Sequence, residues 1–164
     1  MSTLKVATIQ STTGNTGLTI ANDGSVLPKA CAFKINPTSA QSIANATQTT
    51  IAFGETRIDT HGIVDLSNNR VVITAATAGL WNIRFVSRIS NATPPRHISY
   101  IIKNGTTIAV EESTHYSQTV NAYASVPVRC LVDLAASDVL TFAMYHNYGS
   151  ARNTELGSDG ETDI

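Results

Sequence analysis

Residues 80–90, LWNIRFVSRIS, carry the pattern that decides the fold. In an extended chain, one face would carry Trp81, Ile83, Phe85 and Ile89. The opposite face would carry Asn82, Arg84, Arg88 and Ser90. A helix could not separate these two sets, because its period is 3.6 residues whereas the period of a strand is 2. The stretch therefore predicts a β-strand with one face in a hydrophobic core.

Similar strand patterns lie on both sides of this stretch, and turn residues separate them. The other predicted strands of this region are residues 70–77, 97–103, 106–110, 126–134 and 138–146. Asn68-Asn69 supplies a turn before the first of them, and Asn104-Gly105 is a strong signal for a two-residue hairpin of type I′. No segment shows an apolar stripe at helical spacing. The sequence predicts an all-β fold with a core that includes Trp81, Ile83, Phe85, Ile98, Tyr100 and Phe142.

The composition supports this fold class and excludes several functions. The chain has 164 residues, 42% of them hydrophobic, which is enough for one domain with a core. Charged residues make up only 14%, against about 25% in a typical soluble domain, and the net charge is −1. We therefore expect no nucleic-acid binding through phosphate neutralisation. We also expect no membrane insertion, since no apolar run reaches about 18 residues, and no secretion signal at the N-terminus.

No constellation of catalytic or metal-binding residues stands out. Asp59-Thr60-His61 places an acid beside a histidine, but no Gly-x-Ser-x-Gly motif accompanies it. Cys31 and Cys130 lack the paired spacing of a zinc site. Residues 159–163, DGETD, lack the twelve-residue frame of a known calcium loop. We expect a protein that is not an enzyme and that uses no cofactor or metal.

Several predicted strands carry apolar residues on both faces, as in Val71-Val72-Ile73 and Ile101-Ile102. A simple antiparallel sandwich has a polar outer face. A second copy of the same chain is the plainest cover for an apolar one, so we expect an oligomer. Tyrosines suit interfaces and sugar surfaces, and the candidates for trimer or ligand contacts are Tyr116, Tyr123, Tyr145 and Tyr148.

The two ends of the chain differ from the middle. Residues 1–28 hold two short β-like pieces, LKVATI and GLTI, with too few large apolar residues for a core of their own. The last residues are rich in acids. We therefore divide the chain into a hairpin-rich N-terminal segment (1–28), one β domain (29–150) and an acidic C-terminal tail (151–164).

Residues 30–147 resemble the jelly-roll superfamily of complement globular heads and tumour necrosis factor. Four motifs in order carry the resemblance, and one of them is the apolar strand that closes on Asn104-Gly105, as the family's strand closes on Asn-Gly. ACAFKI (residues 30–35) is similar to the family's opening Ala-Phe-Ser-Val strand, and Ala78-Gly79-Leu80-Trp81 to its Pro-Gly-Val-Tyr step. VRCLVDLAASDVLTFAMYH (residues 128–146) is similar to Leu-x-Leu-x-x-Gly-Asp-x-Val, with Ser137-Asp138 in place of Gly-Asp.

The resemblance implies an antiparallel β-sandwich, a TNF-like jelly roll, assembled as a homotrimer about a threefold axis. One part of the family pattern is missing. The family closes with a Phe-Ser-Gly-Phe-Leu strand, and nothing after Asn147 matches it. The last strand is therefore degenerate, supplied by the N-terminal segment, or absent.

The first 28 residues resemble the N-terminal segments of tailed-bacteriophage virion proteins, such as fibre-like and appendage proteins. Leu-Lys-Val-x-Thr-Ile-Gln, a glycine-containing turn, Leu-Thr-Ile and Asp-Gly-Ser-Val carry this resemblance. It implies a viral protein located in the virion, with its N-terminus docked on the particle and its C-terminal module facing outward. The predicted docking residues are Leu4, Val6, Ile9, Leu18 and Ile20.

Two roles remain open for such a virion structural protein. A capsid decoration or cement protein would contact the major capsid protein. A small tail-fibre knob would contact a tail component and present loops to a host surface glycan. The alternative is a tail-fibre module that is primarily an adhesin for host attachment, binding a receptor or glycan. A soluble bacterial lectin-like module and a polysaccharide depolymerase fit less well, because a signal peptide and a carboxylate constellation are missing.

Overall fold

The structure is a computed structural model that describes residues 8–10, 16–19, 30–89, 96–113 and 124–156. The chain forms two compact units, one ending at Cys31 and the other beginning at Ala32. In the first unit, β1 (Thr8–Gln10) and β2 (Thr16–Thr19) pair antiparallel, with Ile9 opposite Leu18. The other predicted docking residues, Leu4, Val6 and Ile20, lie outside the described residues.

The second unit is an antiparallel β-sandwich. Its elements are β3 (Phe33–Asn36), β4 (Ser42–Ile43), β5 (Thr49–Thr50), β6 (Glu55–Asp59), β7 (Val64–Asp65), the 3-10 helix η1 (Leu66–Asn68), β8 (Arg70–Val72), β9 (Gly79–Ile89), β10 (His97–Lys103), β11 (Thr106–Ser113), β12 (Ala124–Leu134), β13 (Val139–His146) and β14 (Arg152–Asn153). Every pair of strands is antiparallel. The fold is therefore all-β and of the jelly-roll type, as the sequence predicts.

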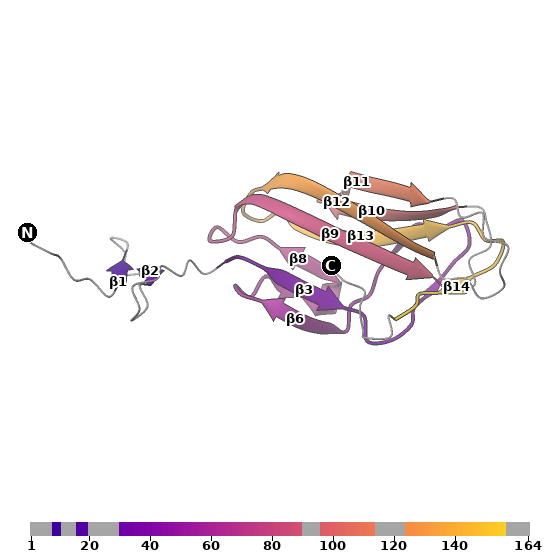
Figure 1. The fold of residues 1–164 in the computed structure, drawn as a ribbon, viewed down its shortest axis with the longest axis horizontal. Helices are drawn as coiled ribbons and strands as arrows, with labels where there is room; N and C mark the ends of the chain where they lie inside the picture. Colours follow the sequence, from indigo (N-terminus) through magenta and orange to yellow (C-terminus); the bar gives the residue numbers. More distant parts are fainter. Residues whose placement is uncertain (1–7, 11–15, 20–29, 90–95, 114–123, 157–164) are drawn as a thin grey trace, which may run out of the picture. The chain divides into compact units, whose positions relative to one another are not determined.

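The sandwich has one wide sheet and one long two-stranded ladder (Figure 1). The wide sheet has the strand order β11-β10-β13-β8-β7, and β5 also pairs with β13. The ladder joins β9 to β12 over their whole length. Two short pairs, β3 with β6 and β4 with β14, complete the unit.

The alternation of β9 builds the core. Trp81, Ile83 and Phe85 are buried and belong to one hydrophobic cluster. Phe85 meets Phe142 of β13 with ring centroids 5.4 Å apart, which joins the two layers. Aromatic pairs at this separation add to the stability from burial alone. The period-2 pattern of residues 80–90 thus positions the centre of the fold.

Tyr100 is only partly buried, which corrects its assignment to the core. Ser99 and Ile101 of β10 face the interior: Ile101 belongs to the core cluster, and the Ser99 hydroxyl donates to the Val126 carbonyl at 2.7 Å. Ile98, although 5% exposed, therefore lies with Tyr100 on the opposite face. The sequence misleads here because Ser99 is polar yet buried with its hydrogen bond satisfied.

The last strand of the jelly roll is degenerate. Arg152–Asn153 form β14, which pairs with β4, and Thr154 bridges to Ile89 at the end of β9. The Thr154 hydroxyl accepts the Gln41 amide at 2.8 Å, and the Thr154 amide donates to the Gln41 carbonyl at 2.8 Å. The ordered sandwich therefore includes residues that the sequence assigns to the tail after residue 150.

The strand predicted at residues 70–77 is shorter than expected, because β8 ends at Val72. The chain then turns: the Thr77 amide donates to the Thr74 carbonyl at 3.0 Å, and the Thr74 amide donates to the Thr77 hydroxyl at 2.8 Å. Threonine favours strands, but its hydroxyl also stabilises turns of this kind. The Thr77 carbonyl accepts the indole N–H of Trp81 at 2.9 Å, so the turn holds the start of β9.

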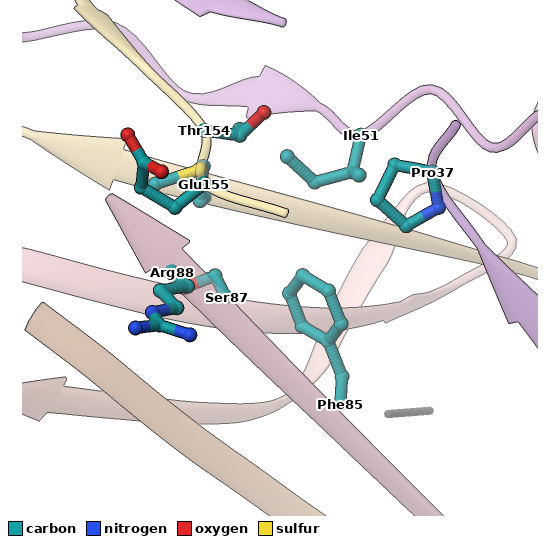
Figure 2. Close-up of a pocket in the computed structure, with 8 residues that line it drawn as sticks. Pro37, Ile51, Phe85, Ser87, Arg88, Thr154 and Glu155 are labelled. Atoms are coloured by element: carbon teal, nitrogen blue, oxygen red, sulfur yellow. The ribbon is translucent and has the colours of Figure 1, made fainter. Parts of the chain in front are cut away.

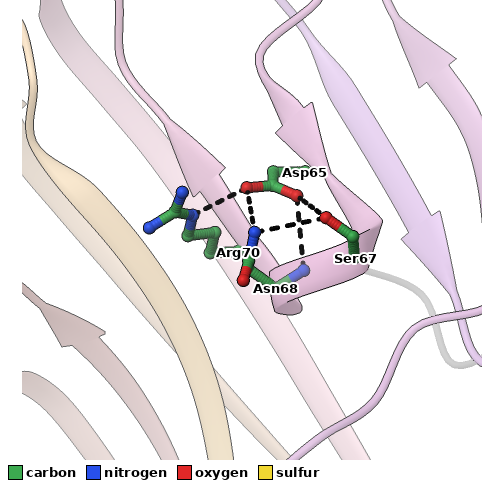
Figure 3. Close-up of polar contacts among 4 residues, drawn as sticks. All are labelled: Asp65, Ser67, Asn68 and Arg70. Atoms are coloured by element: carbon green, nitrogen blue, oxygen red, sulfur yellow. Dashed lines mark hydrogen bonds and ion pairs between the residues drawn. The ribbon is translucent and has the colours of Figure 1, made fainter.

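A capped turn connects β7 to β8 (Figure 3). The Asp65 carboxylate accepts the Ser67 hydroxyl at 2.6 Å, the Asn68 side-chain amide at 2.8 Å and the Arg70 Nε at 2.8 Å. These partners hold the pKa of Asp65 far below its usual range. Asn69 then closes the helix with φ 52°, a left-handed conformation that asparagine tolerates. The turn predicted at Asn68-Asn69 is confirmed.

The predicted hairpin at Asn104-Gly105 is also confirmed. Both residues have positive φ, 51° and 80°, as a type I′ turn requires. The Asn104 side chain ties this turn to the start of β13: its Nδ2 donates to Asp138 at 2.7 Å, and its Oδ1 accepts the Val139 amide at 2.8 Å. Asp138 also pairs with Lys103 at 2.7 Å and accepts the Ala135 amide at 2.8 Å.

These contacts predict a pH-dependent contribution of Asp138 to stability. Hydrogen bonds from Lys103, Asn104 and the Ala135 amide lower the pKa of the carboxyl group. A lowered folded-state pKa stabilises the fold above the ordinary pKa, and this contribution is lost as the pH falls through the folded-state value. We expect Asp138→Asn to lower the melting temperature at pH 7, and the difference from wild type to shrink as the pH is lowered from 7 through and below the ordinary carboxyl pKa of about 4. Melting curves across this range test this; a constant difference would contradict it.

Candidate interaction surfaces

The outer face of the β9–β12 ladder exposes two leucines. Leu80 is 70% exposed and Leu131 is 69% exposed. In the register, Leu131 lies opposite Asn82, and Leu80 lies opposite Asp133. The two leucines are therefore diagonal neighbours on one face, within reach of each other across the strands. The two leucines therefore form a small exposed apolar patch on this face.

The same face carries arginines next to the leucines. Arg84 of β9 lies directly opposite Arg129 of β12, and Arg88 follows on the same face. Within the described part of the chain, neither Arg84 nor Arg129 has an acidic partner. The Arg84 Nε is shielded from solvent and meets no hydrogen-bond acceptor among the described residues. We call residues Leu80, Arg84, Arg129 and Leu131 the ladder face.

The outer face of the wide sheet carries a second polar and aromatic group. Tyr100 and Tyr145 are diagonal neighbours across β10 and β13, and both are partly exposed. Arg96 binds Glu112 beside them through two hydrogen bonds of 2.7 Å. The bond from Arg96 lowers the pKa of Glu112, and burial raises that of Tyr100. Two aromatic rings and a bidentate ion pair therefore lie together on this face.

The tyrosines singled out from the sequence do not form one site. Tyr116 and Tyr123 lie outside the described residues. Tyr145 lies on the outer face of the wide sheet, whereas Tyr148 belongs to the hydrophobic core. The Tyr148 ring stacks on His146 with centroids 5.3 Å apart, and burial raises the pKa of its hydroxyl. Tyr148 follows the end of β13, so the alternation of that strand does not predict which way its side chain points.

A serine–histidine pair that the sequence analysis missed lies inside the sandwich. The Ser87 hydroxyl is 2.7 Å from His97 Nε2 and 2.6 Å from the Ser99 hydroxyl. The distances suit a nucleophile and its base, but Ser87 is 2% exposed and His97 and Ser99 are fully buried. All three side chains are almost completely shielded from solvent, and together they form a hydrogen-bond network of the core.

Asp59 and His61 also have structural partners. The Asp59 carboxylate accepts the backbone amides of Ile63 at 3.0 Å and Val64 at 2.9 Å, and His61 Nδ1 lies 2.8 Å from the Thr60 hydroxyl. Burial raises the pKa of Asp59, but the backbone hydrogen bonds outweigh it and the net pKa is lowered. The carboxylate is therefore occupied in holding its own loop.

One small hollow lies between β9 and the C-terminal strand (Figure 2). Its empty space is about 220 Å³, which includes open solvent at its mouth. Its lining residues are Pro37, Ile51, Phe85, Ser87, Arg88, Met144, Thr154 and Glu155. Across the described ranges, no group of three or more histidine, cysteine or acidic side chains could hold a metal ion. No helix in those ranges is long and apolar enough to cross a membrane.

The antiparallel strands of the second unit form a β-sandwich of the jelly-roll type. Among solved structures, the chain is similar to the globular domain of zebrafish complement 1qA protein, with a TM-score of 0.53. The similarity covers 74% of this chain and 90% of that one at 8% sequence identity, so it shows the fold alone. No family model matches the chain, and no curated protein matches it.

Proposed function

We propose that this chain is a homotrimeric, non-enzymatic structural protein of a bacteriophage virion, docked through its N-terminal segment as a capsid decoration protein or a small fibre knob. The observation that carries the self-association is the ladder face. Leu80 and Leu131 are the most exposed large apolar side chains among the described residues. Covering a leucine fully stabilises a contact by about 1.5–3 kcal/mol.

A second copy is the favoured cover for this face. The low charged fraction, 14%, leaves few side chains to keep sheet faces hydrated. In a closed ring of copies, the same contact repeats around the symmetry axis. The leucine pair of every subunit would therefore be covered by a neighbouring copy. The resemblance to a trimeric superfamily supports three copies rather than two.

Attachment to a particle is supported by the N-terminal unit. β1 and β2 form a unit of their own that ends at Cys31. A two-stranded hairpin is marginal alone in water, so a partner surface would stabilise it. The sequence resemblance of residues 1–28 to phage virion proteins supplies the kind of partner.

Deletion of residues 1–28 tests the docking role. The jelly-roll unit begins at Ala32, so the truncated protein keeps its whole fold. We expect it to remain a folded trimer and to lose at least about 90% of its binding to particles that lack this protein. Co-sedimentation of full-length and truncated protein with such particles measures the loss. Undiminished binding would contradict the docking role, and absence of the native protein from purified particles would contradict the virion role.

The second candidate is an adhesin, which the outer face of the wide sheet favours. Tyr100 and Tyr145 offer rings on which a sugar could stack, and the Arg96–Glu112 pair offers fixed polar atoms beside them. Binding of the purified protein to host surface glycans, compared with its binding to particles, distinguishes the two candidates.

A further inference from the structure

Arg84 and Arg129 are two positive side chains that lie directly opposite each other, and this arrangement is electrostatically unfavourable. The two residues occupy the same rung of an antiparallel ladder and point to the same face. Side chains directly opposite each other on such a ladder have Cβ atoms about 4.5–5.5 Å apart, and like charges there destabilise the pair. A negative charge between the guanidinium groups would remove this repulsion.

The described part of the chain supplies no such charge at this place. Arg57, Arg70 and Arg96 each have an acidic partner, at 2.7, 2.8 and 2.7 Å. Asp133 points to the same side as Arg129, but it lies opposite Leu80, four residues further along β12. Arg84 in addition holds a shielded Nε without an acceptor among the described residues. That Nε is covered by the protein itself, as are the Nε atoms of Arg88 and Arg152, so an anion would bind the other donors of the guanidinium group.

We propose that Arg84 and Arg129 hold a tetrahedral inorganic oxyanion, of the phosphate or sulfate class, where copies of the chain meet. The proposal rests on the proposed function, because the second copy is what covers the ladder face. Each guanidinium group offers a planar fork of donors that fits oxyanions in a bidentate manner. Covering the face excludes water and strengthens both the repulsion between the arginines and their attraction to the anion.

Two other occupants of this place can be distinguished experimentally. A carboxylate from a neighbouring copy would neutralise the arginines without any free ion. An acidic host glycan would need the face to be open, so it would bind a monomer. Only a bound inorganic oxyanion makes the response of the assembled protein to phosphate depend on Arg84 and Arg129.

The test compares the full-length protein in phosphate and in chloride at equal ionic strength and pH. The variants are Arg84→Gln and Arg129→Gln, and the matched control is Arg57→Gln, whose side chain is 52% exposed and paired with Glu55. For the wild type and the control, we expect inorganic phosphate to raise the melting temperature by about 5 °C. For each ladder-face variant we expect this rise to disappear and phosphate affinity by calorimetry to fall at least about tenfold.

Light scattering on the same samples separates the two proposals. A trimer that melts at the same temperature in both salts would overturn the anion site and keep the homotrimer. A monomer that binds phosphate through both arginines would overturn the homotrimer and the placement of the site between copies. A variant that retains the full phosphate response would overturn the assignment of these residues.

Discussion

Replacing Phe142 by alanine is expected to lower the free energy of unfolding by about 3–5 kcal/mol. Phe142 is fully buried, and its ring contacts three other aromatic rings. The centroids of Phe33, Phe53 and Phe85 lie 6.5, 5.9 and 5.4 Å from it. Removing the ring leaves a cavity bounded by side chains from both layers. The strands on either side of this cavity cannot easily move to fill it.

Urea denaturation measures this effect, and Val110→Ala is the matched control. Val110 is 54% exposed on β11, so its truncation should change stability by no more than about 0.5 kcal/mol. Single domains have about 5–15 kcal/mol of stability in total, so Phe142→Ala should also express poorly at 37 °C. A loss below about 1 kcal/mol for Phe142→Ala would show that the two layers do not meet at this ring.

The core-facing residues of β9 and the hairpin turn between β10 and β11 follow from local sequence patterns. Trp81, Ile83 and Phe85 could be assigned because a strand alternates strictly between faces. Asn104-Gly105 could be assigned because few residue pairs tolerate positive φ at two successive positions. These signals depend only on neighbours in the chain, so a single sequence contains them.

The errors arise where distant residues decide the outcome. Ser99 faces the core because Ser87 and Val126, far away in the sequence, satisfy its hydroxyl, and this reverses the face assigned to Tyr100. β14 consists of two residues and is recognisable only by its partners on β4 and β9. Short strands of this kind carry no pattern of their own.

The ladder face shows the same limit for the candidate site. Leu80 and Arg84 could be placed on the outer face from the alternation of β9 alone. Their juxtaposition with Leu131 and Arg129 depends on the register between β9 and β12, which the sequence does not state. An unpaired arginine can be recognised only once the surroundings of its guanidinium group are known.

Replacing both Leu80 and Leu131 by aspartate is expected to convert the proposed homotrimer into a folded monomer. Each subunit would bring two charges into a contact where two leucines, 70% and 69% exposed in the single chain, should be covered. A buried carboxylate without a partner is strongly unfavourable, and the lost apolar contacts add about 1.5–3 kcal/mol for each leucine. We expect the midpoint concentration for assembly to rise by a factor of at least about 1,000.

Sedimentation velocity across a concentration series measures this change, with Val110→Asp as the matched control. Val110 is also an exposed apolar residue, 54% exposed, but it lies on β11 and not on the ladder face. The control should therefore remain a trimer, and both proteins should keep the circular dichroism spectrum of a β-sandwich. If the double variant still sedimented as a trimer, the copies would meet through another surface. If Val110→Asp alone gave the monomer, that surface would include the outer face of the wide sheet.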